Sequence, residues 1–309
     1  MWQNQKQKAF RKTIYLLGPK KKMDVLIIGT IRGSLYSLIA VGFVLIFSVG
    51  GILNLAHGTY YMLGAYLTFV FYHLVLHSGA GGTLVLSMVL AVASVAALAC
   101  LVYYLLLRKK IESLIYTMVM TLALALFVSE IMSLLFGVSG SSVPSLIEGH
   151  LVISGVKIIN HQLILLPIAA LILPGLWIFL KKTKMGQSID AVSQHRTGAL
   201  LMGVSVEKAT LVTSGLSSGL AALAGALIAP VSAVVPEMWL FPLIKAFAIA
   251  ILGGMGSLTG SIIASFLLGY AEVLTSFLIS EQLTEMISLV VIVFVLIFKP
   301  AGIMGYKSS

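Results

Sequence analysis

Three ionisable residues, Glu130, Lys245 and Glu272, interrupt long apolar runs of this sequence. An ionisable side chain at bilayer depth is costly and usually faces the bundle interior or a polar cavity. Lys245 lies 14 residues before Thr259 and Glu272 lies 13 residues after it, so antiparallel helices that turn there would bring both to one depth. We predict a structural intramembrane ion pair, with a transport role as the alternative. Glu130 is a candidate for a translocation pathway.

A polar cluster, Asn54-Leu-Ala-His57-Gly58, stands at the junction of two apolar runs. Broken helices occur at membrane depth only where they are buried in protein or line a cavity. Asn54, His57 and Gly58 are therefore candidates for a translocation pathway. The alternative is a short turn with a capping asparagine and a packed histidine.

A second cluster, Gly253-Gly254-Met255-Gly256, lies close to the end of a later apolar run. Three glycines in four residues favour an unwound turn or a helix packed tightly on a neighbour. We treat the three glycines as further pathway candidates. A plain turn between two spans explains them equally well.

Catalytic signatures are weak or missing in the sequence. It has no GxxxxGK[ST] loop for ATP phosphates and no HExxH zinc motif. Gly215-Leu-Ser-Ser-Gly219 has the form GxSxG, but that motif needs a strand–turn–helix setting and here lies in a Gly/Ala/Ser-rich apolar run. Cys100 is the single cysteine, which excludes an intrachain disulfide and a cysteine-based metal site. We expect no enzyme activity, no cofactor and no metal in this chain.

The elements that position these residues must be transmembrane helices. Of 309 residues, 59% are hydrophobic and 10% are charged, against about 25% charged in a soluble domain. A span needs about 20 apolar residues. The chain predicts an all-α bundle of about eight to nine spans, at 25–48, 55–77, 83–107, 113–136, 161–180, 208–233, 240–258, 260–280 and 285–299, with a long external loop at 137–160.

The formal net charge of +10 is concentrated in a few clusters rather than spread along the chain. Seven Lys/Arg lie in residues 6–22, three are residues 108–110, and five lie between Lys181 and Lys208. Basic clusters between uncharged runs are typical of cytoplasmic loops. They indicate contact with a membrane and need no nucleic acid as a partner.

The charge rule and the span count disagree at the N-terminus. We expect a single transmembrane domain at 24–305 after a basic tail at 1–23. Three spans precede residue 108, which places the basic tail outside, against the rule. Either one early segment does not cross fully, or the natural chain begins at Met23 and the tail is not native.

Residues 181–207 form the longest charged loop, which we expect to be cytoplasmic. Apolar residues recur in it at helical spacing, which predicts a short amphipathic helix that docks in a groove on a partner. The alternative is a helix that lies on the membrane surface. The candidate coupling residues are Ile189 and Val192 on the stripe, Gly198 and Gly203 as a flexible exit, and Gly186 and Asp190 at the helix start and centre.

Several stretches match one family pattern in order along 24–305. They are Gly33–Gly42, Asn54–Tyr66, Thr183–Gly186, Leu201–Val204, Lys245–Ser257, Gly269–Glu272 and Lys299–Gly305. Together they resemble the permeases of the branched-chain amino acid ABC importer family.

The resemblance implies a type II-like ABC importer permease, a multi-pass protein of a bacterial or archaeal plasma (inner) membrane. It implies import of branched-chain amino acids or a similar small polar solute such as urea or amides. The implied partners are a second permease subunit, identical or different, two cytoplasmic ATPase subunits that hydrolyse ATP, and an extracytoplasmic solute-binding protein. The segment 186–205 resembles the loop that inserts into the ATPase.

The alternative function is a self-contained secondary transporter or channel. Such carriers usually show two similar halves. The stretch Asn54–Tyr66 has no counterpart after residue 200, so the sequence favours the importer.

Overall fold

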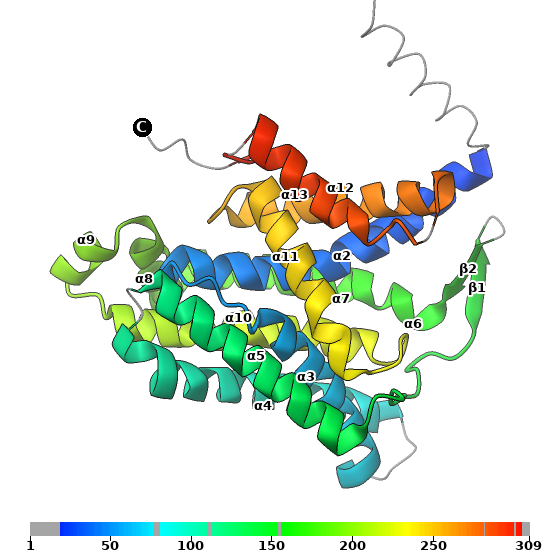
Figure 1. The fold of residues 1–309 in the computed structure, drawn as a ribbon, viewed down its shortest axis with the longest axis horizontal. Coiled ribbons are helices and arrows are strands. Elements are labelled where there is room, and N and C mark those ends of the chain that lie inside the picture. Colours follow the sequence, from blue (N-terminus) through cyan, green and yellow to red (C-terminus); the bar gives the residue numbers. More distant parts are fainter. Residues whose placement is uncertain are drawn as a thin grey trace, which may run out of the picture.

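The computed structural model describes residues 19–76, 81–110, 113–153, 156–280, 282–299 and 301–304. It is a bundle of helices with one small two-stranded sheet (Figure 1). Seven helical stretches are long and apolar enough to cross a membrane, and the shorter α3 and α13 complete the bundle. The predicted polytopic all-α fold is therefore confirmed.

Each predicted span corresponds to a helix or a continuous helical stretch, with ends that differ by a few residues. The first half comprises α2 (Pro19–Gly50), α3 (His57–Val70) with η1 (Phe71–Leu76), α4 (Gly81–Val102) with η2 (Tyr103–Leu107) and η3 (Arg108–Lys110), and α5 (Leu114–Phe136). The second half comprises α6 (Asn160–Leu163), α7 (Leu165–Lys182), α8 (Lys184–Gln194), α9 (Arg196–Leu201), α10 (Val206–Ile228), η4 (Pro236–Trp239), α11 (Leu240–Gly253), α12 (Leu258–Leu278) and α13 (Met286–Phe298).

The expected external loop contains a β-hairpin that the sequence analysis did not predict. Strand β1 (His150–Ile153) pairs antiparallel with β2 (Val156–Ile159). The hairpin is held at its base by His161, whose Nδ1 accepts from the backbone N–H of Leu146 at 3.2 Å. Its Nε2 therefore carries the proton and donates to the carbonyl of Leu227 at 3.0 Å. The hairpin thus marks one end of the bundle, and α8 with α9 marks the other (Figure 1).

Helix α2 runs through the bundle from the hairpin end to the α8 end (Figure 1). Its last turns join the apolar cluster that includes α8. Along its middle it packs closely on α12, because Gly33 and Gly269 carry no side chain: a Cβ on Gly269 would come within 3 Å of the Gly33 backbone. Small residues allow such close contact between helix backbones.

The chain leaves α2 at Gly51, where a φ of +62° ends the helix. Residues 51–56 turn back along the bundle before α3 begins. His57, the first residue of α3, lies beside the middle of α2, with its Nε2 2.9 Å from the carbonyl oxygen of Ile39. Helix α3 therefore starts inside the bundle rather than at its surface.

The first three passages along the bundle agree with the predicted span count. Helix α2 runs towards α8, the stretch 51–76 returns, and α4 runs towards α8 again, where Arg108 pairs with Glu207 at the start of α10 at 2.7 Å. The Pro19 end of α2 thus lies with the hairpin (Figure 1). Of the predicted basic tail at 1–23, residues 1–18 lie outside the described residues, and residues 19–23 form the start of α2.

Candidate functional site

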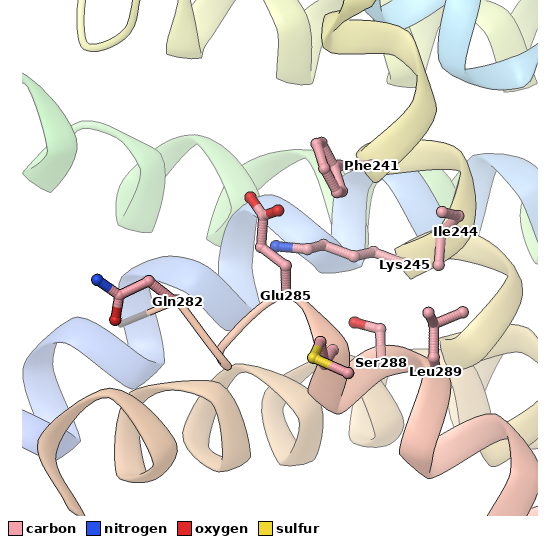
Figure 2. Close-up of a pocket in the computed structure, with 8 residues that line it drawn as sticks. Phe241, Ile244, Lys245, Gln282, Glu285, Ser288 and Leu289 are labelled. Atoms are coloured by element: carbon pink, nitrogen blue, oxygen red, sulfur yellow. The ribbon is translucent and has the colours of Figure 1, made fainter. Parts of the chain in front are cut away.

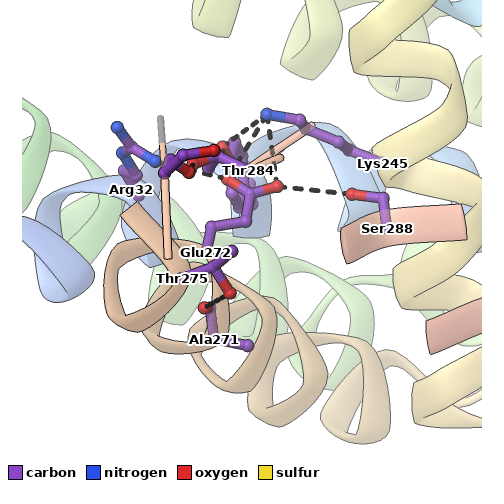
Figure 3. Close-up of polar contacts among 9 residues, drawn as sticks. Arg32, Lys245, Ala271, Glu272, Thr275, Thr284 and Ser288 are labelled. Atoms are coloured by element: carbon purple, nitrogen blue, oxygen red, sulfur yellow. Dashed lines mark hydrogen bonds and ion pairs between the residues drawn. The ribbon is translucent and has the colours of Figure 1, made fainter. Parts of the chain in front are cut away.

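The carboxylate of Glu272 lies at the centre of a buried polar cluster. Its side chain has no exposed surface. Lys245 Nζ lies 3.3 Å from Oε1, and Arg32 NH1 lies 3.6 Å from Oε2. The Tyr36 hydroxyl donates to Oε2, and Ser288 Oγ donates to Oε1 at 3.3 Å. The cluster thus joins α2, α11, α12 and α13 through one residue (Figure 3).

Tyr36 links the two charges of the predicted pair. Its hydroxyl accepts from Lys245 Nζ at 2.7 Å while it donates to Glu272. The ammonium also lies 4.7 Å from the centre of the Tyr36 ring, within range of a cation–π contact. A charge taken out of water is tolerated only when its partners and hydrogen bonds are in place. This arrangement satisfies that requirement for both members of the pair.

Lys245 and Glu272, predicted as a pair from the sequence, lie together in the structure. Arg32, Tyr36 and Ser288 were not predicted. One signal was present: Arg32 is the only Lys or Arg between 25 and 107. A Tyr four residues further on shares its helix face, so the spacing of Arg32 and Tyr36 was available from the sequence.

A cavity of about 160 Å³ adjoins this cluster between α11 and α13. Lys245 forms part of its wall, and its side chain extends into the space in Figure 2. The remaining wall contains one carboxylate, one amide, one hydroxyl and several apolar groups. These are Phe241, Ile244, Gln282, Glu285, Met286, Ser288 and Leu289.

The first set of pathway candidates is packed inside the chain. Asn54 and His57 are buried, and Asn54 Oδ1 accepts from the backbone N–H of Ala56 at 3.1 Å. Gly58 has no room for a Cβ, which would meet the carbonyl oxygen of Trp239. The structure therefore resembles the alternative reading, with a turn-stabilising asparagine and a packed histidine. None of the three residues lines the cavity beside Lys245.

The second set, Gly253, Gly254 and Gly256, forms the connection between α11 and α12. Gly254 and Gly256 have φ values of +101° and +90°, which favour glycine. Gly253 packs against the backbone of Gly260, where a Cβ would not fit. These glycines build a tight turn, and they too lie away from the cavity.

Glu130 has a different environment from Glu272. It lies on α5, a helix whose apolar window is only 11% buried within this chain. Its side chain is exposed and forms no ion pair with any described residue. The neighbouring Ser129 ties α5 to η4 by donating to the carbonyl of Pro236 at 3.0 Å.

The α8 region corrects one sequence-based expectation. Ile189 and Val192 were expected to enter a partner's groove, but they are 1% and 3% exposed and pack within this chain against Leu45, Val49 and Leu180. The amphipathic pattern identified the buried face of α8 correctly, but that face binds α2 and α7. Docking on a partner by these two side chains is therefore excluded while the fold is intact.

The other candidates in this loop shape its two short helices. Gly186 packs on the backbone of α7, and Asp190 pairs with Lys181 at 2.8 Å. The backbone N–H of Gly198 donates to His195 Nδ1 at 2.8 Å, and Gly203 takes a φ of +80° after α9. Three exposed apolar residues that were not among the candidate coupling residues lie at the end of α9: Leu200, Leu201 and Met202.

Comparisons with known proteins agree on one family. The sequence model described as "Branched-chain amino acid transport system / permease component" matches residues 25–296. The LivH permease of the high-affinity branched-chain amino acid transport system of Escherichia coli K12 is 28% identical over 295 residues, covering 90% of this chain and 93% of LivH. The corresponding BraD protein of Pseudomonas aeruginosa is 26% identical over 92% of this chain and 95% of its own.

Among solved structures, PsaBC from Streptococcus pneumoniae aligns with a TM-score of 0.47 at 14% identity. The alignment covers 94% of this chain and 97% of that chain.

Proposed function

Because the chain belongs to the family of branched-chain amino acid ABC transport permeases, we propose that it is the membrane-spanning subunit of an ATP-driven importer for branched-chain amino acids. The observation that carries this proposal is the family match over 25–296, which covers nearly all of the bundle. The relatives named LivH and BraD belong to high-affinity branched-chain amino acid systems and support the same solute class. The partners would be a second permease, two ATPases and an extracytoplasmic solute-binding protein.

The distribution of charge supports a cytoplasmic location for the α8 end. Cytoplasmic loops carry an excess of Lys and Arg. Basic residues gather near this end of the bundle on η3, α7, α8, α9 and α10 and after α13: Arg108, Lys109, Lys110, Lys181, Lys182, Lys184, Arg196, Lys208 and Lys299. The hairpin end would then face the solute-binding protein.

The tip of α9 is the best candidate for contact with an ATPase. Leu201 and Met202 are 84% and 85% exposed at the basic end of the molecule. Helix α8 beneath them is fixed to the bundle through Ile189 and Val192. An apolar tip on a rigid base suits insertion into a groove on a partner, and movement of the groove would be passed to the bundle.

Exposure of Glu130 favours α5 as the face that borders the solute path and the second permease. A carboxylate that faces lipid is expensive. A hydrated path between two permeases would supply polar surroundings for this carboxylate, which forms no ion pair with the described residues.

The proposal is tested by reconstituting the permease with its partner subunits in proteoliposomes. We expect uptake of L-leucine only when ATP, the ATPases and the solute-binding protein are all present, with competition by L-isoleucine and L-valine. Uptake by the lone chain would show a secondary carrier. If urea or acetamide competes better than the branched-chain amino acids, the proposed solute is wrong and the ATP-driven mechanism still stands.

Contact through the α9 tip is tested by the double variant Leu201→Asp with Met202→Asp. It should lose ATPase co-purification and uptake while its unfolding temperature stays unchanged, because both side chains are exposed. The control Gln187→Asp places a charge on the exposed face of α8 and should retain both. Normal ATPase binding by the double variant would exclude the tip as the contact.

A further inference from the structure

We propose that the cavity between α11 and α13 binds one aliphatic amino acid as a zwitterion, with its carboxylate on Lys245 and its ammonium on Glu285. This inference rests on the proposed function and assigns a solute site within a single permease chain. The cavity measures about 160 Å³, well below the ~300–1,000 Å³ typical of drug-sized ligands. It therefore suits a solute with few non-hydrogen atoms.

The buried cluster behind the cavity leaves Lys245 able to bind an anion. Two cations, Arg32 and Lys245, face the single carboxylate of Glu272. An ammonium has three N–H donors. Contacts with the Tyr36 hydroxyl and Glu272 account for two of them. The third donor and the surplus positive charge are available to a ligand carboxylate.

Glu285 supplies the opposite charge on the same cavity. Its side chain is exposed and forms no ion pair within the described part of the chain. Figure 2 shows its carboxylate and the Lys245 ammonium directed into the same region of the cavity. Ser288 on the same wall is fully buried and donates to Glu272, so it holds the cluster behind the cavity. An ammonium of a solute would therefore meet the Glu285 carboxylate.

The rest of the wall is suited to an aliphatic side chain. Phe241 and Ile244 come from α11, and Met286 and Leu289 come from α13. Apolar walls with a few convergent polar groups are the usual composition of small-molecule sites. A wall with one cation, one anion, two uncharged polar groups and four apolar side chains matches an aliphatic amino acid. It fits an uncharged solute such as urea poorly, because both charges would stay unpaired.

The test measures protection of a cysteine at the cavity rim. Gln282→Cys, in a Cys100→Ala background, is placed in the assembled importer in phosphatidylglycerol nanodiscs without ATP, and its rate of reaction with a maleimide is followed. Ser142→Cys in the exposed loop before the hairpin is the matched reporter outside the cavity. We expect L-leucine to slow the reaction of the rim cysteine and to leave that of the loop cysteine unchanged.

A ligand series separates the two charge contacts. 3-Methylbutylamine keeps only the ammonium and 4-methylpentanoate keeps only the carboxylate. Each should need about tenfold more ligand than L-leucine for the same protection, the factor expected for one lost ion pair. Glu285→Gln should remove the advantage of L-leucine over 4-methylpentanoate. The control Glu148→Gln, an exposed carboxylate in the loop, should preserve it.

Several results would overturn the assignment. They are no protection, equal protection of both reporters, or an unchanged ligand order in Glu285→Gln. A lipid headgroup could also supply paired charges. If phosphatidylethanolamine in the nanodisc slows the reaction and L-leucine adds nothing, the cavity binds lipid and the amino acid assignment is wrong. ATP-driven L-leucine uptake without protection would refute this site and leave the proposed function intact.

Discussion

Glu272 and Glu130 are two carboxylates in apolar helices with opposite surroundings. Glu272 is fully buried and is contacted by Arg32, Tyr36, Lys245 and Ser288. Glu130 is exposed on α5 and forms no ion pair with a described residue. The first charge is therefore stabilised by this chain itself. The second has no such stabilisation from the described residues.

The largest expected effect is on Glu272. Glu272→Gln leaves the partly buried Lys245 ammonium without its counter-charge, which costs up to about 3–5 kcal/mol. We expect a large fall in the unfolding temperature of the purified protein, measured by thermal denaturation in detergent. The double variant Lys245→Met with Glu272→Leu should recover much of the loss. A double variant no more stable than Glu272→Gln would show that the two residues are not energetic partners.

The second-largest effect on stability is expected at the Tyr36 hydroxyl, which lies between Lys245 and Glu272. Tyr36→Phe keeps the ring but removes the group that accepts from Lys245 and donates to Glu272. Leaving buried charged groups short of a hydrogen bond costs about 1–3 kcal/mol. The same thermal measurement should place this variant between Glu272→Gln and the parent. Tyr270→Phe is the control, because the Tyr270 hydroxyl contacts only the partly buried, uncharged Thr30 in the described structure. It should lower the unfolding temperature less than Tyr36→Phe does.

A smaller effect is expected for Ser288→Ala. It removes one hydrogen bond of 3.3 Å to the carboxylate oxygen Oε1 of Glu272. A hydrogen bond to a charged group is worth about 1.5–3 kcal/mol, and the length of this one favours the lower end. Because Ser288 belongs to α13, the loss should appear first as faster local opening of that helix. Hydrogen exchange of α13 amides measures this, with α10 amides as the internal reference. Equal acceleration in both helices would contradict a local role.

Glu130→Gln should have the smallest effect on stability, within about 0.5 kcal/mol, as for an exposed site. Its effect should appear in transport instead, as reduced ATP-driven uptake at equal protein level. Glu148→Gln, also exposed, is the control and should transport normally. If Glu130→Gln lowers the unfolding temperature as much as Glu272→Gln does, the stability of the chain depends equally on both carboxylates and the proposed difference between them is wrong.

The sequence was most informative where one physical requirement dominates. A transmembrane helix needs about 20 apolar residues, and this requirement alone predicted the position of every long helix. The matched positions of Lys245 and Glu272 around Thr259 anticipated their proximity. Arg32, Tyr36 and Ser288 come from distant parts of the chain. Their place beside Glu272 depends on how α2 and α13 pack, and helix periodicity does not carry that information.

The α8 region shows the same limit more sharply. The apolar stripe with Ile189 and Val192 predicts that one face of the helix is buried. It does not predict which surface covers that face. The covering surface is supplied by α2 and α7 of the same chain. The β-hairpin at β1 and β2 was missed for a related reason, because two strands of four residues give too short an alternation to recognise.

Helix α2 connects the charge cluster around Glu272 rigidly with the apolar contact that holds α8. Tyr36 on this helix donates a hydrogen bond to the buried carboxylate, and Val49 near its last turn packs against α8. These residues are 13 positions apart in one unbroken helix, about 20 Å at 1.5 Å per residue. Because a helix resists stretching, an axial displacement of Val49 would move Tyr36 by a similar distance. Helix α2 therefore couples the position of α8 to the charge cluster.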